Sequence, residues 1–185
     1  MRDLAEERRR LGIGRLDECW EGVWRFRHST GRRQQIAARL WRIISEVIED
    51  TGRGTASISI NVTDREDGWI DNHRCPDGAV ILQGNPGRWI GEDEVAFLGG
   101  PDLVIDVMSP GDRTREKLPF YGSLRVREVL IVEEDTGRPT IWRGGEVFTE
   151  SPGEPLRSEI TGLEFSKGPQ GTLLVRHPSG KTWTV

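Results

Sequence analysis

Cysteine is scarce in this chain of 185 residues, which contains only Cys19 and Cys75. Two thiols exclude a framework of several disulfides and a zinc site built from four cysteines, and they fit a reduced, cytoplasmic setting. The sequence also lacks any apolar run near the roughly 18 residues that a membrane span requires. Its charged start, MRDLAEERRRLG, has no apolar segment of the kind that a secretory signal carries. We therefore expect a cytoplasmic protein without a membrane segment.

An excess of positive charge is absent too. The 26 Lys and Arg residues face 30 Asp and Glu residues, for a net charge of −4. This balance excludes a broad basic surface for coating nucleic acid but allows a local basic patch. Only three of the 26 cations are lysines: Lys117, Lys167 and Lys181. An Arg-rich genome explains this bias, yet a lysine inside a motif stands out because an amine differs chemically from a guanidinium.

Length and pattern predict one domain over residues 1–185, because roughly 100–200 residues per domain is usual. Apolar residues recur three and four positions apart over 33–50, which predicts an amphipathic helix. Residues 16–28 predict a short helix leading into a strand. The other predicted elements are strands at 55–63, 76–83, 102–108 and 128–133, a helix at 113–124, and later strands from 140 onward. This order predicts an α/β (α+β) fold with a mixed sheet, a core over about 33–143 and a β-rich extension over about 144–185.

Three aspartates lie in or beside apolar strands, where an unpaired charge is costly: Asp77, Asp102 and Asp106. Asp102 and Asp106 face the same side of one strand but lie about 13 Å apart at roughly 3.3 Å per residue, so they cannot share an ion. Asp77 begins its strand and Asp106 lies late in its own, so antiparallel pairing of these strands would bring the two carboxylates together. Carboxylates that close need a cation between them, and Mg²⁺ or Mn²⁺ is the natural candidate. The alternative for Asp77, which follows a proline, is a structural turn cap.

Lys117 follows Asp106 by eleven residues, near the start of the predicted helix 113–124. After the turn SPGD, this helix start can fold back over the end of the strand. An ammonium there could orient or deprotonate a water, or neutralise charge on a phosphate. The alternative is a solvated surface lysine. Nearby arginines could bind phosphate or form exposed salt bridges: Arg113, Arg115 and Arg127.

The middle of the chain carries the segment PDLVIDVMSPGDRTREKLPFYGSLRVREVLIVEEDTGRP, preceded by Pro76-Asp77. This pattern closely resembles the Uma-two restriction endonuclease family of the PD-(D/E)XK nuclease superfamily. Weaker similarity covers residues 17–24, 33–40 and 158–165. The matching positions include Pro101 to Pro110, Lys117, Tyr121, Val126, Glu128, Val132 and Glu133. The resemblance implies a restriction-endonuclease-like mixed β-sheet core flanked by helices, with extra N-terminal and C-terminal strands.

The resemblance also implies roles for individual residues. Asp77 and Asp106 match the two metal-binding acids of the family. Lys117 matches the family's lysine, which lies on the helix in this family. The position two residues after Asp106, where the superfamily pattern has its lysine, is Met108 here.

The chain departs from the family pattern at several positions, among them Arg125-Val126 in place of the usual Gly-Val. Asp106 stands where the family usually has Glu, which shortens the arm by one methylene. A His common at the start of the first helix is absent, and Arg33 or Gln34 stands there instead. Glu18 and Glu46 are candidates for an additional acid from the N-terminal region.

These residues together predict a Mg²⁺- or Mn²⁺-dependent endonuclease that hydrolyses DNA phosphodiester bonds, with Asp77, Asp106 and Lys117 as catalytic residues. Family analogy adds a homodimer, because cutting both strands usually takes two active sites. One alternative is a catalytically inactive protein that keeps the fold as a binding or dimerisation module. Another is an interaction surface on the β-rich extension, although the scatter of the seven tryptophans favours ordinary packing.

Overall fold

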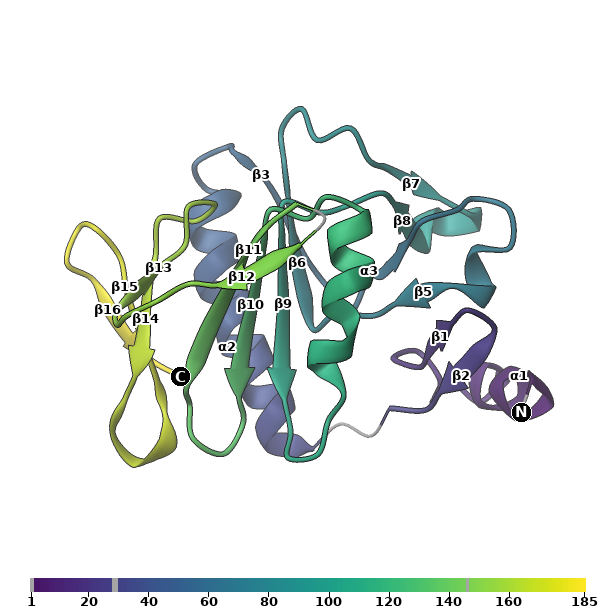
Figure 1. Cartoon of the computed structure of the whole chain (residues 1–185), viewed down its shortest axis with the longest axis horizontal. Helices are drawn as coiled ribbons and strands as arrows, with labels where there is room; N and C mark the ends of the chain where they lie inside the picture. The colour runs from purple at the N-terminus through teal and green to yellow at the C-terminus, as the bar shows by residue number, and fades with distance from the viewer. Residues whose placement is uncertain (1, 28–29, 146) are drawn as a thin grey trace.

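The structure is a computed structural model that describes residues 2–27, 30–145 and 147–185 (Figure 1). Its described α-helices are α1 (Arg2–Arg10), α2 (Gly31–Ile48) and α3 (Leu118–Ser123). In these ranges of the chain, no helix is long and apolar enough to cross a membrane.

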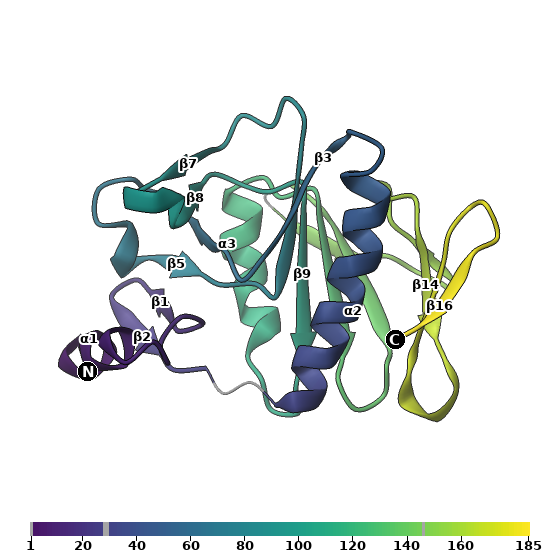
Figure 2. The same cartoon turned by 180° about the vertical axis from the view of Figure 1, so that it is seen from behind.

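The central sheet has the strand order β12-β11-β10-β9-β6-β3. These strands are β3 (Gly54–Ile58), β6 (Gly78–Leu82), β9 (Leu103–Met108), β10 (Glu128–Glu133), β11 (Pro139–Gly144) and β12 (Phe148–Glu150). β9 and β10 are parallel and the other neighbours are antiparallel, so the predicted mixed sheet is confirmed. Figures 1 and 2 show α3 on one face of this sheet and α2 on the other.

Successive side chains of β9 point to opposite faces of the sheet. Val104 packs with Tyr121 of α3 in a smaller core. By the same alternation Asp106 faces the α3 side, where its side chain is fully buried. The main core, which includes the apolar face of α2, takes the alternate residues Leu103, Ile105 and Val107. A charged residue on this central strand therefore lies inside the protein.

Two of the three predicted helices are present with shifted bounds. α2 begins at Gly31 because the side chain of Thr30 caps it and accepts a hydrogen bond from the N–H of Arg33 at 3.0 Å. The helix predicted over 113–124 divides into a 3₁₀ turn over Thr114–Lys117 and α3. Pro119 falls in the first turn of α3, where the missing N–H costs nothing. The division places Lys117 directly before α3.

A second sheet contains the N-terminal strands, in the order β2-β1-β5-β4-β8-β7. Its strands are β1 (Glu18–Trp20), β2 (Val23–Arg25), β4 (Asn61–Thr63), β5 (His73–Arg74), β7 (Arg88–Ile90) and β8 (Ala96–Leu98). The prediction of a short helix within 16–28 is wrong, since β1 and β2 form a hairpin. Glu21 and Gly22 have φ values of 48° and 79°. Positive φ at both central residues is the geometry of a tight two-residue hairpin turn.

The strand predicted over 55–63 is two strands in two sheets. β3 pairs with β6 in the central sheet, whereas β4 pairs with β5 and β8 in the second sheet. Ser59, between them, has a φ of 52°, and this left-handed residue turns the chain from one sheet to the other. The sequence hides the break because apolar residues continue at every second position from 56 to 62.

The C-terminal strands form a third, antiparallel sheet, at the left of Figure 1. They are β13 (Leu156–Arg157), β14 (Glu164–Lys167), β15 (Leu173–Arg176) and β16 (Thr182–Thr184). Apolar residues of this sheet, among them Phe165 and Val175, share the main core with α2. Glu128 of β10 also holds the segment after β13, because it accepts hydrogen bonds from the Ser158 hydroxyl at 2.6 Å and the Glu159 N–H at 2.7 Å.

Candidate active site

Asp77 and Asp106 come together where β6 meets β9. The two strands are antiparallel and Gly78 lies opposite Ile105, so the next residues along, Asp77 and Asp106, are neighbours. Oδ2 of Asp77 accepts a hydrogen bond from the backbone N–H of Val107 at 2.7 Å. The predicted adjacency of the two aspartates is confirmed.

One guanidinium joins the two aspartates. Nη2 of Arg27 lies 3.2 Å from Oδ1 of Asp77 and 3.1 Å from Oδ1 of Asp106. Burial raises the pKa of Asp77, against the opposing effect of Arg27. Burial also raises the pKa of Asp106 to about 6, although Lys117 and Arg27 oppose it. The surrounding cations therefore oppose the effect of burial on both carboxyls without cancelling it.

Lys117 approaches the pair from the start of α3 and is 3% exposed. Its Nζ lies 3.1 Å and 3.3 Å from the two carboxylate oxygens of Asp106 and 2.8 Å from Oε1 of Glu18. Burial lowers the pKa of Lys117, but the two carboxylates outweigh burial and raise this pKa above its ordinary value. Lys117 is therefore a protonated, buried residue and not a solvated surface lysine.

Glu18 of β1 reaches the cluster from the second sheet. Its carboxylate accepts hydrogen bonds from Nε1 of Trp20 at 2.7 Å and from the N–H of Cys75 at 2.9 Å. Burial raises the pKa of Glu18, but Lys117, Arg27 and the hydrogen bond from Cys75 outweigh burial and lower the pKa below its usual range. Of the two candidates for an additional acid, Glu18 thus lies at the cluster and contacts it through Lys117.

Sequence reasoning did not identify Arg27 or Arg33 as members of this cluster. Arg33 is 1% exposed, an unusual burial for a charged side chain. Its guanidinium contacts Asp77 at 3.0 Å and Asp112, in the turn after β9, at 2.7 Å. The sequence could have indicated the burial of Arg33, because Arg33 lies three residues before Ile36 and so on the same, buried face of α2. A charge on the apolar face of a helix needs a buried partner.

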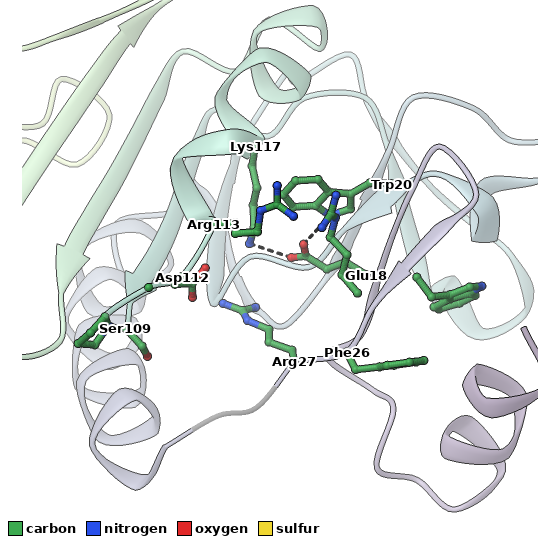
Figure 3. Close-up of a pocket in the computed structure, with 12 residues that line it drawn as sticks. Glu18, Trp20, Phe26, Arg27, Ser109, Asp112, Arg113 and Lys117 are labelled. Atoms are coloured by element: carbon green, nitrogen blue, oxygen red, sulfur yellow. Dashed lines mark hydrogen bonds and ion pairs between the residues drawn. The ribbon is translucent and has the colours of Figure 1, made fainter. Parts of the chain in front are cut away.

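A cavity of about 500 Å³ adjoins the cluster. Figure 3 shows Glu18 and Lys117 pointing toward one another, with Arg27 below them. The guanidinium of Arg25 lies 4.2 Å from the ring centroid of Trp20. Further aromatic and basic residues of the lining are Trp24, Phe26 and Arg113. The cavity combines cations, which suit a phosphate, with aromatic rings, which suit a base.

Comparison with known proteins agrees with the motif. Residues 18–168 match the Uma2 family, the Uma-two family above, which is described as putative restriction endonuclease. The chain belongs to the Uma2 family. The crystal structure of a putative nuclease belonging to DUF820 from Anabaena variabilis ATCC 29413 has a TM-score of 0.59 and 17% sequence identity, covering 77% of this chain and 79% of that chain. This likeness shows the fold alone, and no curated protein matches the chain.

The family resemblance leads us to expect a His at the start of α2, where this chain has Arg33 or Gln34. The sequence left this place open between Arg33 and Gln34, and in the structure Arg33 contacts Asp77. Gln34 borders a different cavity, of about 560 Å³, on another side of Arg27. A guanidinium is always charged, whereas an imidazole can be neutral. This Uma2 protein therefore has a permanent positive charge beside Asp77.

Two of the three predicted phosphate-binding arginines lie at the same end of the central sheet as the cluster. Arg113 lines the 500 Å³ cavity and is paired with Glu116 at 2.7 Å. Arg115 lies 3.5 Å from Glu133, at the end of β10, and does not line that cavity. Both side chains are about half exposed, so both remain open to a ligand.

The expectations for Arg127 and Glu46 need correction, because neither residue lies at the cluster. Arg127 is 3.4 Å from Asp102, at the opposite end of β9 from the acid pair. That end is about 13 Å away at roughly 3.3 Å per residue. Glu46 pairs with Lys181 of the C-terminal sheet. It lies thirteen residues beyond Arg33 in α2, about 20 Å along the helix axis.

The donor set suits the divalent cation that the sequence predicts. Asp77 and Asp106 offer hard carboxylate oxygens on adjacent strands, and Mg²⁺ is commonly held by one or two carboxylates with waters. Glu18 does not add a third ligand, because Lys117 contacts both Glu18 and Asp106. Among the described residues, no three Asp, Glu, His or Cys side chains form a metal-binding group. The two carboxylates offer the oxygens that such an ion would use, and Nη2 of Arg27 contacts both of those oxygens in this structure.

Proposed function

We propose that this Uma2 protein is a Mg²⁺- or Mn²⁺-dependent endonuclease that hydrolyses DNA phosphodiester bonds. The observation that carries the proposal is the buried pair of Asp77 and Asp106 on adjacent strands, with the ammonium of Lys117 against Asp106. The family description and that of the structural relative, a putative nuclease, support the same reaction class.

Asp77 and Asp106 are the residues that would hold the ion. When bound, the metal supplies a polarised phosphate oxygen and a water of lowered pKa. Lys117 is protonated and cannot accept a proton, so its part is to donate hydrogen bonds to negative charge that develops on the phosphate. Glu18 contacts Lys117 and not the acid pair, so it acts as a positioning residue that holds the ammonium in place.

The 500 Å³ cavity is the proposed position of the DNA strand next to the cluster. Arg25 and Arg113 line it and supply local positive charge to an otherwise acidic chain. Such a local patch allows a protein of negative net charge to approach a polyanion, and binding should weaken as salt rises. For cleavage of both strands we propose a homodimer, in which each copy contributes one such cavity.

An inactive binding module is the second candidate, and one observation favours it. Arg27, Arg33 and Lys117 already compensate Asp77 and Asp106, so the cluster can stand as a buried ionic network. The two candidates differ in whether a divalent cation binds to the acid pair.

The test is calorimetric titration of Mn²⁺ and Mg²⁺ into the wild type, Asp106→Asn and Asp102→Asn, with cleavage of plasmid, single-stranded DNA and RNA by each. Asp102 is the matched control, because it lies at the other end of β9 and accepts hydrogen bonds from Leu82 and Asn85. Thermal unfolding of each variant establishes that it is folded.

Metal binding and DNA cleavage that persist in Asp102→Asn and vanish in Asp106→Asn would support the nuclease. Absence of both metal binding and cleavage in the folded wild type would contradict it and leave the binding module. Cleavage of RNA alone would correct the substrate. Light scattering during gel filtration tests the homodimer, and a monomeric mass with DNA bound would contradict it.

A further inference from the structure

Arg27 holds the position that a metal ion would take between the two aspartates. Its Nη2 contacts Oδ1 of Asp77 and Oδ1 of Asp106, at 3.2 Å and 3.1 Å. An ion bound by these two oxygens would lie about 2.1 Å from each. The ion and Nη2 would then compete for the same two oxygens, and two cations at such close range repel each other strongly.

We propose that Arg27 is a tethered cation that exchanges with the divalent ion, and that it leaves the acid pair when the ion binds. This inference rests on the metal site of the proposed function. It assigns to Arg27 the control of metal affinity, because the ion binds only to molecules in which the guanidinium has moved away.

The charges of the cluster favour an ion that replaces Arg27 over an ion that binds while Arg27 stays in place. Its three cations, Arg27, Arg33 and Lys117, face four carboxylates, Glu18, Asp77, Asp106 and Asp112. Counted with every group in its charged form, the cluster has one net negative charge. A divalent ion added to this set would leave one net positive charge in a buried place, whereas an ion that replaces Arg27 leaves the cluster neutral. Burial makes an uncompensated charge costly, so the neutral arrangement is the more stable.

Arg27 is the most exposed of the three cations, although its Nη1 also donates to the carbonyl oxygen of Cys75. The side chain of Arg33 is 2% exposed and contacts Asp112 as well as Asp77. That of Lys117 is 4% exposed and lies between two carboxylates. The side chain of Arg27 is 10% exposed.

Space for the displaced guanidinium exists on both sides of Arg27. The residue lines the 500 Å³ cavity beside Lys117 and also the 560 Å³ cavity beside Gln34. Its backbone N–H donates to Oδ1 of Asp17 at 3.0 Å, so the main chain stays anchored while the side chain turns. Rotation into the first cavity would bring the guanidinium to the place proposed for the DNA phosphates.

The experiment compares Mn²⁺ binding by calorimetry in the wild type, Arg27→Gln and Arg25→Gln. Arg25→Gln is the matched control, since Arg25 lines the same cavity but stacks on Trp20 instead of contacting the acids. Arg27→Gln should bind Mn²⁺ about tenfold more tightly or better, because the competing cation is gone. Arg25→Gln should bind as the wild type does. Equal or weaker Mn²⁺ affinity in folded Arg27→Gln would overturn the proposal.

A second measurement uses the wild type alone, so it does not depend on a variant that folds. Phenylglyoxal modifies exposed guanidiniums, and mass spectrometry locates the modified residue. Mn²⁺ should increase modification of Arg27 and leave that of Arg33 unchanged. Bound Mn²⁺ with no gain at Arg27 would overturn the exchange.

The outcomes separate this inference from the proposed function. Tight Mn²⁺ binding by Arg27→Gln without DNA cleavage by any protein would support the exchange and contradict the nuclease. DNA cleavage by the wild type, with the same Mn²⁺ affinity in Arg27→Gln as in the wild type, would support the nuclease and contradict the exchange. No Mn²⁺ binding by either protein would overturn both.

Discussion

Substitution of Lys117 by Met tests the electrostatic account of the cluster directly. Met is close to Lys in length and fills the same space without a charge or a hydrogen-bond donor. Lys117 is 3% exposed, and its Nζ is 2.8 Å from Glu18 and 3.1 Å from Asp106. The change therefore removes charge from a buried position and leaves little cavity behind.

Loss of one partner from a buried ion pair destabilises a protein by about 3–5 kcal/mol, because a charge is left uncompensated. Here two carboxylates lose a partner, but each keeps others. Asp106 still contacts Arg27, and Glu18 still accepts from Trp20 and from the N–H of Cys75. We therefore expect the free energy of unfolding to fall by about 3 kcal/mol, at the lower end of that range.

Urea unfolding followed by tryptophan fluorescence measures this loss. The control is Lys181→Met, since the side chain of Lys181 is 52% exposed and its pair with Glu46 should contribute less than about 1 kcal/mol. The double variant Lys117→Met/Glu18→Gln should recover about 1–2 kcal/mol, because it neutralises a stranded carboxylate. A cost below about 1 kcal/mol for Lys117→Met, or simple addition of the two single costs, would refute the reasoning.

Three further changes test other parts of the structure. Glu128→Gln should lower the free energy of unfolding by about 2 kcal/mol in a urea titration without changing Mn²⁺ affinity, whereas the exposed Glu159→Gln should have little effect. Burial lowers the pKa of His73 below 6.5, so the unfolded chain binds this proton more tightly and stability falls as pH drops below about 6.5. His73→Gln should remove this contribution, so the difference in free energy of unfolding between wild type and variant should change by at most about 1.4 kcal/mol per pH unit. A difference that stays constant as the pH changes would contradict this reasoning. Gly100→Ala should cost about 1–3 kcal/mol by thermal unfolding, because a Cβ there would overlap the carbonyl oxygen of Leu124.

The adjacency of the two aspartates could be predicted because it depends only on strand pairing. Asp77 begins one apolar strand and Asp106 lies late in another, and antiparallel pairing brings such positions together. The position of Lys117 followed from one turn, SPGD, and the helix after it. Both inferences use contacts that the local pattern of the chain specifies.

The cations of the cluster could not be predicted in the same way. Arg27 and Arg33 are separated from the aspartates by 44 to 79 residues, and their positions depend on how the β1–β2 hairpin and the start of α2 pack. The first strand of this hairpin, β1, was predicted to be a helix, because three residues before a tight turn give a weak strand signal. Glu18 and Glu46 looked alike as candidates, and only packing separates the acid at the cluster from the one at the far end of α2.

The spacing of the cluster along the chain has a consequence for the entropy of closing it. Lys117 lies eleven residues from Asp106, whereas Arg27 reaches Asp106 across a sequence separation of 79. Closing a loop costs more entropy as the loop lengthens, so Lys117 compensates Asp106 at a lower entropic cost than Arg27 does. The contact of Arg27 with the acid pair therefore depends most on how firmly the β1–β2 hairpin packs against the central sheet.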